Sequence, residues 1–295
     1  RLDLEAHLDS ALALLQSPEI DLTTKTQILD VLSETRIDAA RPLLLSLLED
    51  SDQALLPAVL ATLQIYDDPL IARAVIDQLP SWEGSVRDAA EGLLTSRLGW
   101  SRLWIRSMDQ TAAAHTSVNA VAQLRRFKDP AVTNGLEKWF TSTTATSGTS
   151  FDAEIDRIKS VLSVPGGDAL RGYRHYQQRC AACHTLFDQG GLVGPDLTSY
   201  QRDDSESLLL SIVHPSAEIR AGYEMTTIKT KDGRSLSGFL SRNDDQLVGI
   251  RTVGGNEIVL RHEQITQLEM QENSLMPEGL LAGLNEAALR DLFNY

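Results

Sequence analysis

The feature that most constrains this chain is the segment Cys180-Ala181-Ala182-Cys183-His184, which contains its only two cysteines. Two thiols three residues apart, followed directly by a histidine, form the C-x-x-C-H pattern that is typical of a c-type haem attachment site. On a helical turn, residues at i, i+3 and i+4 share a face, so both thiols can react with the haem while His184 reaches the iron. The pattern therefore predicts covalently attached haem c at this segment.

Two alternatives use the same cysteines. A thioredoxin-like redox pair would follow a strand, whereas residues 168–179, just upstream, have a helical pattern. A structural zinc site would need two more ligands, drawn from histidines none of which have H-x3-5-H spacing: His7, His115, His175, His184, His214 and His262. We favour the haem interpretation over both.

Length, composition and charge limit the remaining classes. The chain has 295 residues, 42% of them hydrophobic, which suffices for two domains, and it has no apolar run of membrane-spanning length. Its net charge of −14 argues against nucleic-acid binding and favours a basic or neutral protein partner, although acidity also serves solubility. The chain begins at Arg1 without a signal peptide, so we expect a processed or excised piece of a longer protein. Because haem is attached to C-x-x-C-H after export in bacteria, the motif favours a periplasmic or other extracytoplasmic location.

Residues 1–140 show helical apolar periodicity that nearly repeats. The segment Ile28–Leu32 aligns with Val59–Leu63, and further helices are expected at Val86–Leu94 and Val118–Phe127. An aspartate and proline between paired helices, and a V-R-x-A-A sequence in one of them, resemble HEAT repeats. The pattern predicts a helical solenoid, which would serve as a partner-binding surface or a spacer.

A low-complexity stretch of serine and threonine, Thr141–Ser150, marks a domain boundary. It is followed by a predicted amphipathic helix, Phe151–Val164, which ends at a Pro-Gly-Gly sequence. We therefore expect a repeat domain at 1–140, a linker with a short helix at 141–167, and a haem domain at 168–295. All four tryptophans fall in the first of these and are expected to serve packing: Trp82, Trp100, Trp104 and Trp139.

The segment Asp168–Cys180 resembles the first helix of a class I cytochrome c. Asp168 is a natural N-cap, and Gly172 and Tyr176 lie four residues apart on one face. In that family the first helix crosses the last one at such a glycine, which allows close approach. The segment Glu286–Tyr295 is the expected last helix.

Ten residues after the motif, Gly194-Pro195-Asp196-Leu197 resembles the G-P-x-L sequence of class I cytochromes. The resemblance implies that the Pro195 carbonyl accepts the Nδ1 proton of His184 and orients its ring. It also implies that Leu197 covers the haem.

The second iron ligand has to come from later in the chain. Of the four methionines, Met276 lies in a loop just before the last helix, where class I cytochromes place their methionine ligand. We therefore expect His184 and Met276 to be the axial pair. The alternatives are bis-histidine partners: His175, His214 and His262.

More residues separate His184 from Met276 than a minimal cytochrome uses, which predicts an insertion. After a helix at Ser205–Val213, short alternating runs separated by turn sequences predict four or five strands over about 221–271. Four of these runs are Tyr223–Thr230, Leu236–Ser241, Leu247–Thr252 and Glu257–Leu260. Their spacing suggests a small SH3-like β-barrel, so the predicted fold is mainly α with a small β insertion.

Residues 168–295 also resemble the haem-binding domain of planctomycetes and verrucomicrobia, which follows HEAT-like repeats and is often joined to a β-propeller dehydrogenase-like domain. The resemblance rests on C-A-A-C-H, G-P-D-L, I-V-H-P-S, G-Y-E, K-D-G and S-L-M-P-E-G-L. It implies an electron-transfer module that relays electrons from an exported dehydrogenase to a downstream acceptor and is not an enzyme by itself. The other hypotheses are a haem-based small-ligand sensor or peroxidase-like enzyme, and a solenoid scaffold with a structural haem.

Overall fold

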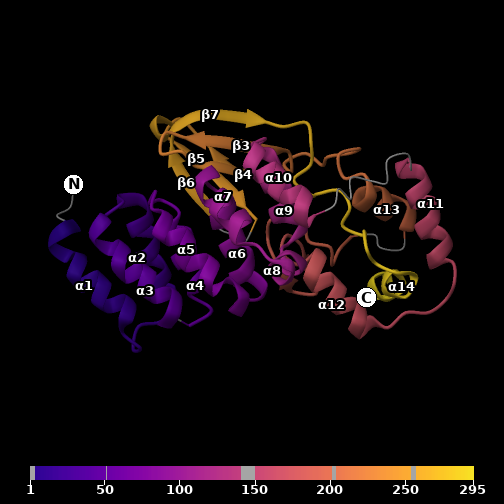
Figure 1. The fold of residues 1–295 in the computed structure, drawn as a ribbon, viewed down its shortest axis with the longest axis horizontal. Helices are drawn as coiled ribbons and strands as arrows, with labels where there is room; N and C mark the ends of the chain where they lie inside the picture. The colour runs from indigo at the N-terminus through magenta and orange to yellow at the C-terminus, as the bar shows by residue number, and fades with distance from the viewer. Residues whose placement is uncertain (1–3, 51, 141–149, 201–203, 254–256) are drawn as a thin grey trace.

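A computed structural model describes residues 4–50, 52–140, 150–200, 204–253 and 257–295. Figure 1 shows an array of helices formed by the first half of the chain, a β-sheet beside it, and a second group of helices that includes the C-terminal one. The helices of the array are α1 (Leu4–Gln16), α2 (Leu22–Thr35), α3 (Arg41–Asp50), α4 (Leu56–Leu63), α5 (Pro69–Gln78), α6 (Gly84–Thr95), α7 (Leu98–Ser107), α8 (Gln110–His115), α9 (Val118–Arg126) and α10 (Pro130–Trp139).

From α2 to α7, helices of the array pack against the helix two positions further along the chain. Contacts join α2 to α4 and α4 to α6 on one side, and α3 to α5 and α5 to α7 on the other. Aspartate or serine side chains cap the first turns of several of these helices, which satisfies backbone N–H groups that have no helical partner. The two aligned segments of the predicted repeat lie in α2 and α4, and the further predicted helices are present as α6 and α9, whereas no bounds were predicted for α7 and α8.

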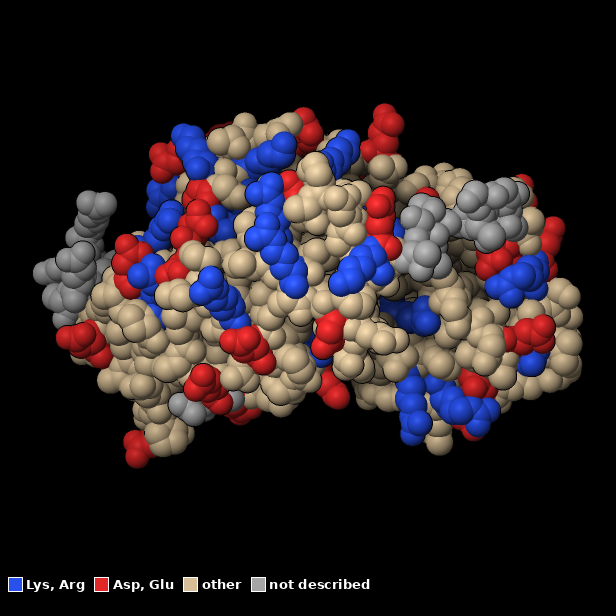
Figure 2. All heavy atoms as spheres, in the orientation of Figure 1, with Lys and Arg blue, Asp and Glu red and all other residues tan. Residues whose placement is uncertain are grey.

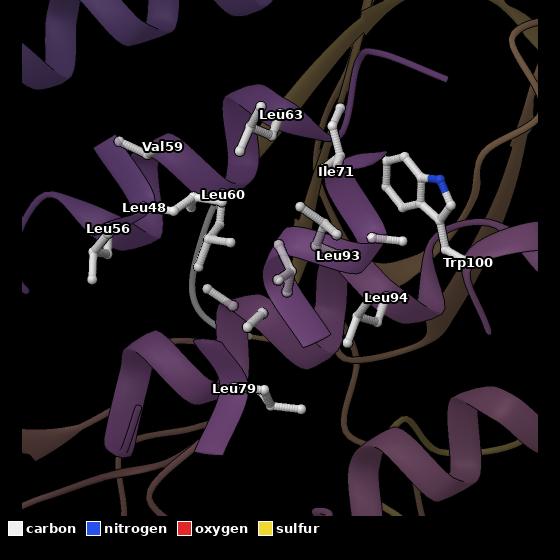
Figure 3. Close-up of a cluster of buried hydrophobic side chains, with 14 of the residues drawn as sticks. Leu48, Leu56, Val59, Leu60, Leu63, Ile71, Leu79, Leu93, Leu94 and Trp100 are labelled. Atoms are coloured by element: carbon white, nitrogen blue, oxygen red, sulfur yellow. The ribbon is translucent and has the colours of Figure 1, made fainter. Parts of the chain in front are cut away.

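The core of the array is formed by leucines, together with tryptophans. Figure 3 shows Leu60 and Leu63 of α4 and Leu93 and Leu94 of α6 within one buried cluster, with the ring of Trp100 from α7 beside Ile71 of α5. Trp100 and Trp104 are fully buried, and the other two tryptophans also contact this core. The tryptophans therefore serve packing, as predicted.

The second group of helices is α11 (Phe151–Leu162), α12 (Ala169–Arg179), α13 (Ser205–Val213) and α14 (Glu286–Asn294). Ile158 of α11, Leu209 of α13 and Leu289 of α14 share one buried apolar cluster. The short helix α11 therefore packs with the C-terminal helices. Of the predicted Ser/Thr linker, residues 141–149 lie outside the described residues, and Ser150 caps α11.

Helices α12 and α14 cross at Gly172. A Cβ atom at this position would lie 2.0 Å from the Asp291 carbonyl oxygen, so the two backbones approach more closely than any other residue permits. The Asp291 carboxylate accepts hydrogen bonds from Arg171 Nε at 2.7 Å and Arg171 Nη2 at 3.1 Å, and from the Asp168 backbone N–H at 2.7 Å. The predicted crossing at Gly172 is confirmed, and the carboxylate fixes its register.

Asp291 is expected to make the stability of this domain depend on acid pH. Its pKa is lowered, mainly by the hydrogen bond from Arg171. A depressed pKa contributes stability above the unfolded-state value of about 4, and that contribution disappears as pH falls through the folded-state value. We expect Asp291→Asn to lower the urea midpoint at pH 7 and to flatten its decline below about pH 4. Glu286→Gln, which alters an exposed pair on the same helix, is the control, and an identical acid profile for both variants would contradict the assignment.

The β insertion is an antiparallel sheet with the strand order β6-β5-β4-β3-β7. Its strands are β3 (Met225–Thr230), β4 (Ser235–Asn243), β5 (Leu247–Thr252), β6 (Glu257–Arg261) and β7 (Ile265–Met270). The first four agree with the predicted runs to within two residues, and β7 is the strand for which we predicted no bounds. A separate pair, β1 (Thr185–Leu186) and β2 (Gln189–Gly190), follows the C-x-x-C-H segment.

The sheet packs against the helical array through a buried arginine. Arg97, at the start of α7, is 3% exposed, and its guanidinium lies over the ring of Trp100. It donates to the Gln64 carbonyl within the array and to the Asp232 carbonyl in the turn between β3 and β4. The backbone N–H of Ser235 also donates to the Ser96 carbonyl at 2.8 Å. The sheet and the array therefore share a polar junction, beside α6 and α7 in Figure 1.

Charged side chains of both signs are interspersed on the face shown in Figure 2. The excess of acidic residues therefore does not form one broad patch on that face. None of the described helices combines the length and apolar character that a membrane crossing requires.

Candidate haem-binding site

The end of α12 places the two thiols on one turn. The backbone N–H of Cys180 donates to the Tyr176 carbonyl, and the N–H groups of Cys183 and His184 both donate to the Cys180 carbonyl, at 3.1 and 2.9 Å. Neither cysteine forms a disulfide. The motif therefore follows a helix, as predicted, and not the strand that a thioredoxin-like pair would require.

Burial is the main cause of the pKa shifts of Cys180, Cys183 and His184. It raises the pKa of Cys180 to about 11 and that of Cys183 to about 12, and it lowers the pKa of His184. The side chains are therefore neutral near pH 7. A neutral imidazole has one nitrogen lone pair that can bind a metal.

The His184 ring is oriented by the segment that we matched to G-P-x-L. Its Nδ1 lies 2.8 Å from the Pro195 carbonyl oxygen, and because a carbonyl only accepts, Nδ1 carries the proton. A Cβ atom on Gly194 would lie 2.6 Å from His184 Cε1, so this glycine lets the backbone lie flat on the ring. The Leu197 N–H donates to the Thr185 carbonyl at 2.8 Å, which anchors the segment beyond the ring. The Nε2 lone pair of His184 is thereby left for a metal.

The loop between the motif and Pro195 packs its backbone directly on the motif. The Gly191 N–H donates to the Ala181 carbonyl and the Gly194 N–H to the Cys183 carbonyl, at 2.7 and 2.6 Å. The Tyr176 hydroxyl donates to the His184 carbonyl, so the helix face that crosses α14 also supports the motif. These contacts hold the thiols and the imidazole in one rigid unit.

Met276 is half-buried in the segment that precedes α14. The neighbouring Leu275 is buried in a cluster with Val193 and Met225, and Cys183 packs against that cluster. The structure thus brings the Met276 segment to the side of the molecule where the second thiol lies. The other methionines are placed differently: Met108 is in the core of the array, Met225 is buried in the sheet, and Met270 is exposed.

The three alternative histidine ligands have neighbours elsewhere. The ring of His214 stacks on Phe151 with centroids 3.9 Å apart, and His262 Nε2 lies 2.8 Å from the Asp244 carbonyl oxygen at an exposed position. His175 lies on α12, close enough to Asp291 to contribute, after Arg171 and Asp168, to lowering the pKa of that carboxyl. Among the described residues, no group of three or more His, Cys, Asp and Glu side chains is placed to hold a metal ion in the way that the zinc alternative requires.

One side chain of the helical array contacts the site and another acts on it electrostatically, and sequence reasoning missed both. The Asn119 amide nitrogen on α9 lies 3.8 Å from Cys183 Sγ, and Asp88 on α6 adds to the rise in the pKa of this thiol after the larger effect of burial. Nothing in the local sequence around either residue points to the motif, because the contact depends on how the array and the haem domain dock. Arg179, directly before the motif, was also missed, although a cation beside the first cysteine is visible in the sequence.

The residues present suit haem c. Two unpaired thiols on one turn match the two thioether bonds of such a haem, and the imidazole beside them has its Nδ1 committed to a carbonyl and its Nε2 available. The chemistry of this donor set is suited to one axial ligand of a haem iron and to the covalent anchor of the haem.

Comparison with known proteins agrees with this geometry. Residues 169–250 match the family model described as Cytochrome c, which covers α12, the motif, the Pro195 segment, α13 and part of the sheet. No curated protein matches the chain. The match supports a c-type cytochrome domain whose cofactor is covalently attached haem c, a type of domain that transfers electrons and is typically extracytoplasmic.

Proposed function

We propose that residues 168–295 form a one-electron carrier in which Cys180 and Cys183 anchor the haem and His184 and Met276 bind the iron. The observation that carries the proposal is the 2.8 Å contact between His184 Nδ1 and the Pro195 carbonyl oxygen, which fixes the tautomer that a proximal histidine needs. Gly194 supports the ring from beneath, and Leu197 is proposed to cover the haem. When bound, the haem supplies the redox chemistry. The chain's own residues orient its ligands and restrict water.

We extend the proposal to the rest of the chain. The helical array is taken to be a HEAT-like solenoid over 1–140 and the sheet at about 221–271 to be SH3-like, with the residues between 141 and 167 as connection. In this arrangement the module exchanges electrons with a redox protein partner, such as a dehydrogenase domain of the same longer chain, in the periplasm or outside the cell. It has no catalytic acid or base of its own, since electron transfer needs none.

Spectra and potentials of the pure protein test the ligand assignment. In Met276→Ala we expect a coordination site to open and the reduction potential to fall, because a thioether ligand favours Fe(II). The visible and near-infrared spectra of the oxidised and reduced protein, a redox titration and the binding of added imidazole are the measurements. Met270→Ala removes an exposed methionine and is the matched control.

The outcome separates the proposed carrier from the sensor hypothesis. A parent protein that binds small ligands at once would favour the sensor. A Met276→Ala protein that keeps the parent's low-spin spectrum and potential would show that another side chain binds the iron.

A further inference from the structure

Arg179 joins the end of α12 to the segment that follows Met276. It is the last residue of α12 and directly precedes the first cysteine of the motif. Its Nη1 donates to the Leu280 carbonyl at 2.7 Å and to the Ala282 carbonyl at 3.1 Å. Both are hydrogen bonds from a charged donor, which are stronger than those between neutral groups.

The two carbonyls belong to a tight turn that begins soon after Met276. Gly279 and Gly283 adopt positive φ values of 79° and 77°, and the Ala282 N–H donates to the Gly279 carbonyl at 2.9 Å. The intervening Leu280 and Leu281 are buried. Arg179 therefore fixes a shaped turn whose first residues are a few bonds from the Met276 backbone.

The other side of the Met276 segment is anchored separately. The Ser274 N–H donates to the Ser216 hydroxyl, and the Met276 N–H donates to the Ser274 hydroxyl, both at 3.1 Å. Leu275 is buried in the apolar cluster against which Cys183 packs. Met276 thus lies between a neutral anchor on its N-terminal side and the Arg179 anchor on its C-terminal side.

We propose that Arg179 is a positioning residue for Met276, holding the 279–283 turn against the helix end that carries the thiols. The inference rests on the proposed ligation of iron by Met276. A methionine side chain has three rotatable bonds and little rotamer preference, so a stable bond from its sulfur requires a fixed backbone. In this arrangement one guanidinium ties the covalent anchor of the haem to the segment that provides the sixth ligand.

The test compares variants of the haem-loaded protein in the rate at which added imidazole replaces the native sixth ligand of the ferric form. Arg179→Met removes both hydrogen bonds, and we expect this rate to rise about 10- to 100-fold, the factor that a charge-assisted hydrogen bond contributes. Amide hydrogen exchange at Ala282 and Leu284 should rise as well. Arg174→Met, which removes an exposed guanidinium from the same helix, should match the parent in both measurements.

Arg179→Lys keeps the charge and one of the two hydrogen bonds, so we expect it to give an intermediate rate of imidazole replacement. If Arg179→Met fails to take up haem, Arg179→Lys is compared with Arg174→Met in its place. Imidazole replacement as slow as in Arg174→Met overturns the positioning role, even where hydrogen exchange is faster, because Arg179 would then stabilise the turn only. Met276→Ala is measured in parallel. If Met276→Ala keeps the parent's sixth ligand, Met276 does not bind the iron, and both the proposed ligation and the positioning role are wrong. If Met276→Ala loses that ligand, a negative result with the Arg179 variants rules out only the positioning role.

Discussion

Replacing Gly172 with alanine is expected to destabilise the haem domain by about 2 kcal/mol. The added Cβ would meet the Asp291 carbonyl oxygen at 2.0 Å and the Tyr295 Cβ at 2.8 Å, so the two helices must move apart. Overpacking of this kind costs about 3 kcal/mol, whereas alanine gains about 1 kcal/mol over glycine in helix propensity. The clash therefore outweighs the propensity, and the urea midpoint followed by haem absorbance should fall.

Gly99 provides the matched control for this substitution. It lies in α7, is exposed, and a Cβ atom there would meet nothing within 4 Å. Gly99→Ala should therefore leave stability unchanged or raise it by up to about 1 kcal/mol. Equal effects of the two substitutions would show that close approach at Gly172 does not matter.

Replacing Arg97 with methionine is expected to uncouple the sheet from the helical array. The substitution breaks a buried charged link and leaves the carbonyls of Gln64 and Asp232 without their donor, which costs about 3 kcal/mol. We expect thermal unfolding of the parent to be a single transition, and that of the variant to separate into two, one for the array and one for the haem domain. Calorimetry measures the transitions, and Arg106→Met, an exposed arginine at the other end of α7, is the control.

Tryptophan fluorescence gives a second measure of the same coupling. All four tryptophans belong to the array, and haem quenches their emission by energy transfer when it lies near. Because Asn119 of the array contacts Cys183, we expect strong quenching in the parent and brighter emission in Arg97→Met. Unchanged emission together with a single transition would mean that other contacts hold the two parts together. We also expect residues 1–140 and 168–295 each to fold alone, because each part has a buried apolar cluster of its own and coupled domains can still be independently stable.

The roles of residues around the haem motif were predictable where the interacting residues are close in sequence or where a sequence pattern reflects a local geometric need. Asp168 caps α12, Gly172 allows the helix crossing, and the Pro195 carbonyl meets His184 as the G-P-x-L resemblance implied. In each case the side chain, or the lack of one, meets a local geometric requirement. Such requirements are visible in a single sequence.

Contacts between distant parts of the chain were not predictable. The approach of Asn119 to Cys183, the link from Arg97 to Asp232 and the bonds from Arg179 to the turn before α14 each join residues far apart in sequence. They depend on how preformed units dock, and asparagine or arginine at these positions is equally compatible with a solvated surface. Bounds for strand β7 were not predictable for a related reason: its residues are half-buried or exposed, and its neighbour in the sheet, β3, is the first strand of the insertion in sequence.

The chain enters the β-sheet and leaves it at nearly the same point of the haem domain. The Gln271 N–H donates to the Met225 carbonyl at 2.7 Å, so the residues at the beginning and end of the sheet are one hydrogen bond apart. The sheet therefore connects the helices on either side of it as a short turn would. Because the two ends of the sheet are adjacent, inserting it adds little to the entropy cost of closing the chain between those helices. Apart from Met225 and the residues that pack with it against the haem motif, the sheet can therefore diverge in sequence, lengthen or acquire new contacts with the array without requiring the helices around the haem to change.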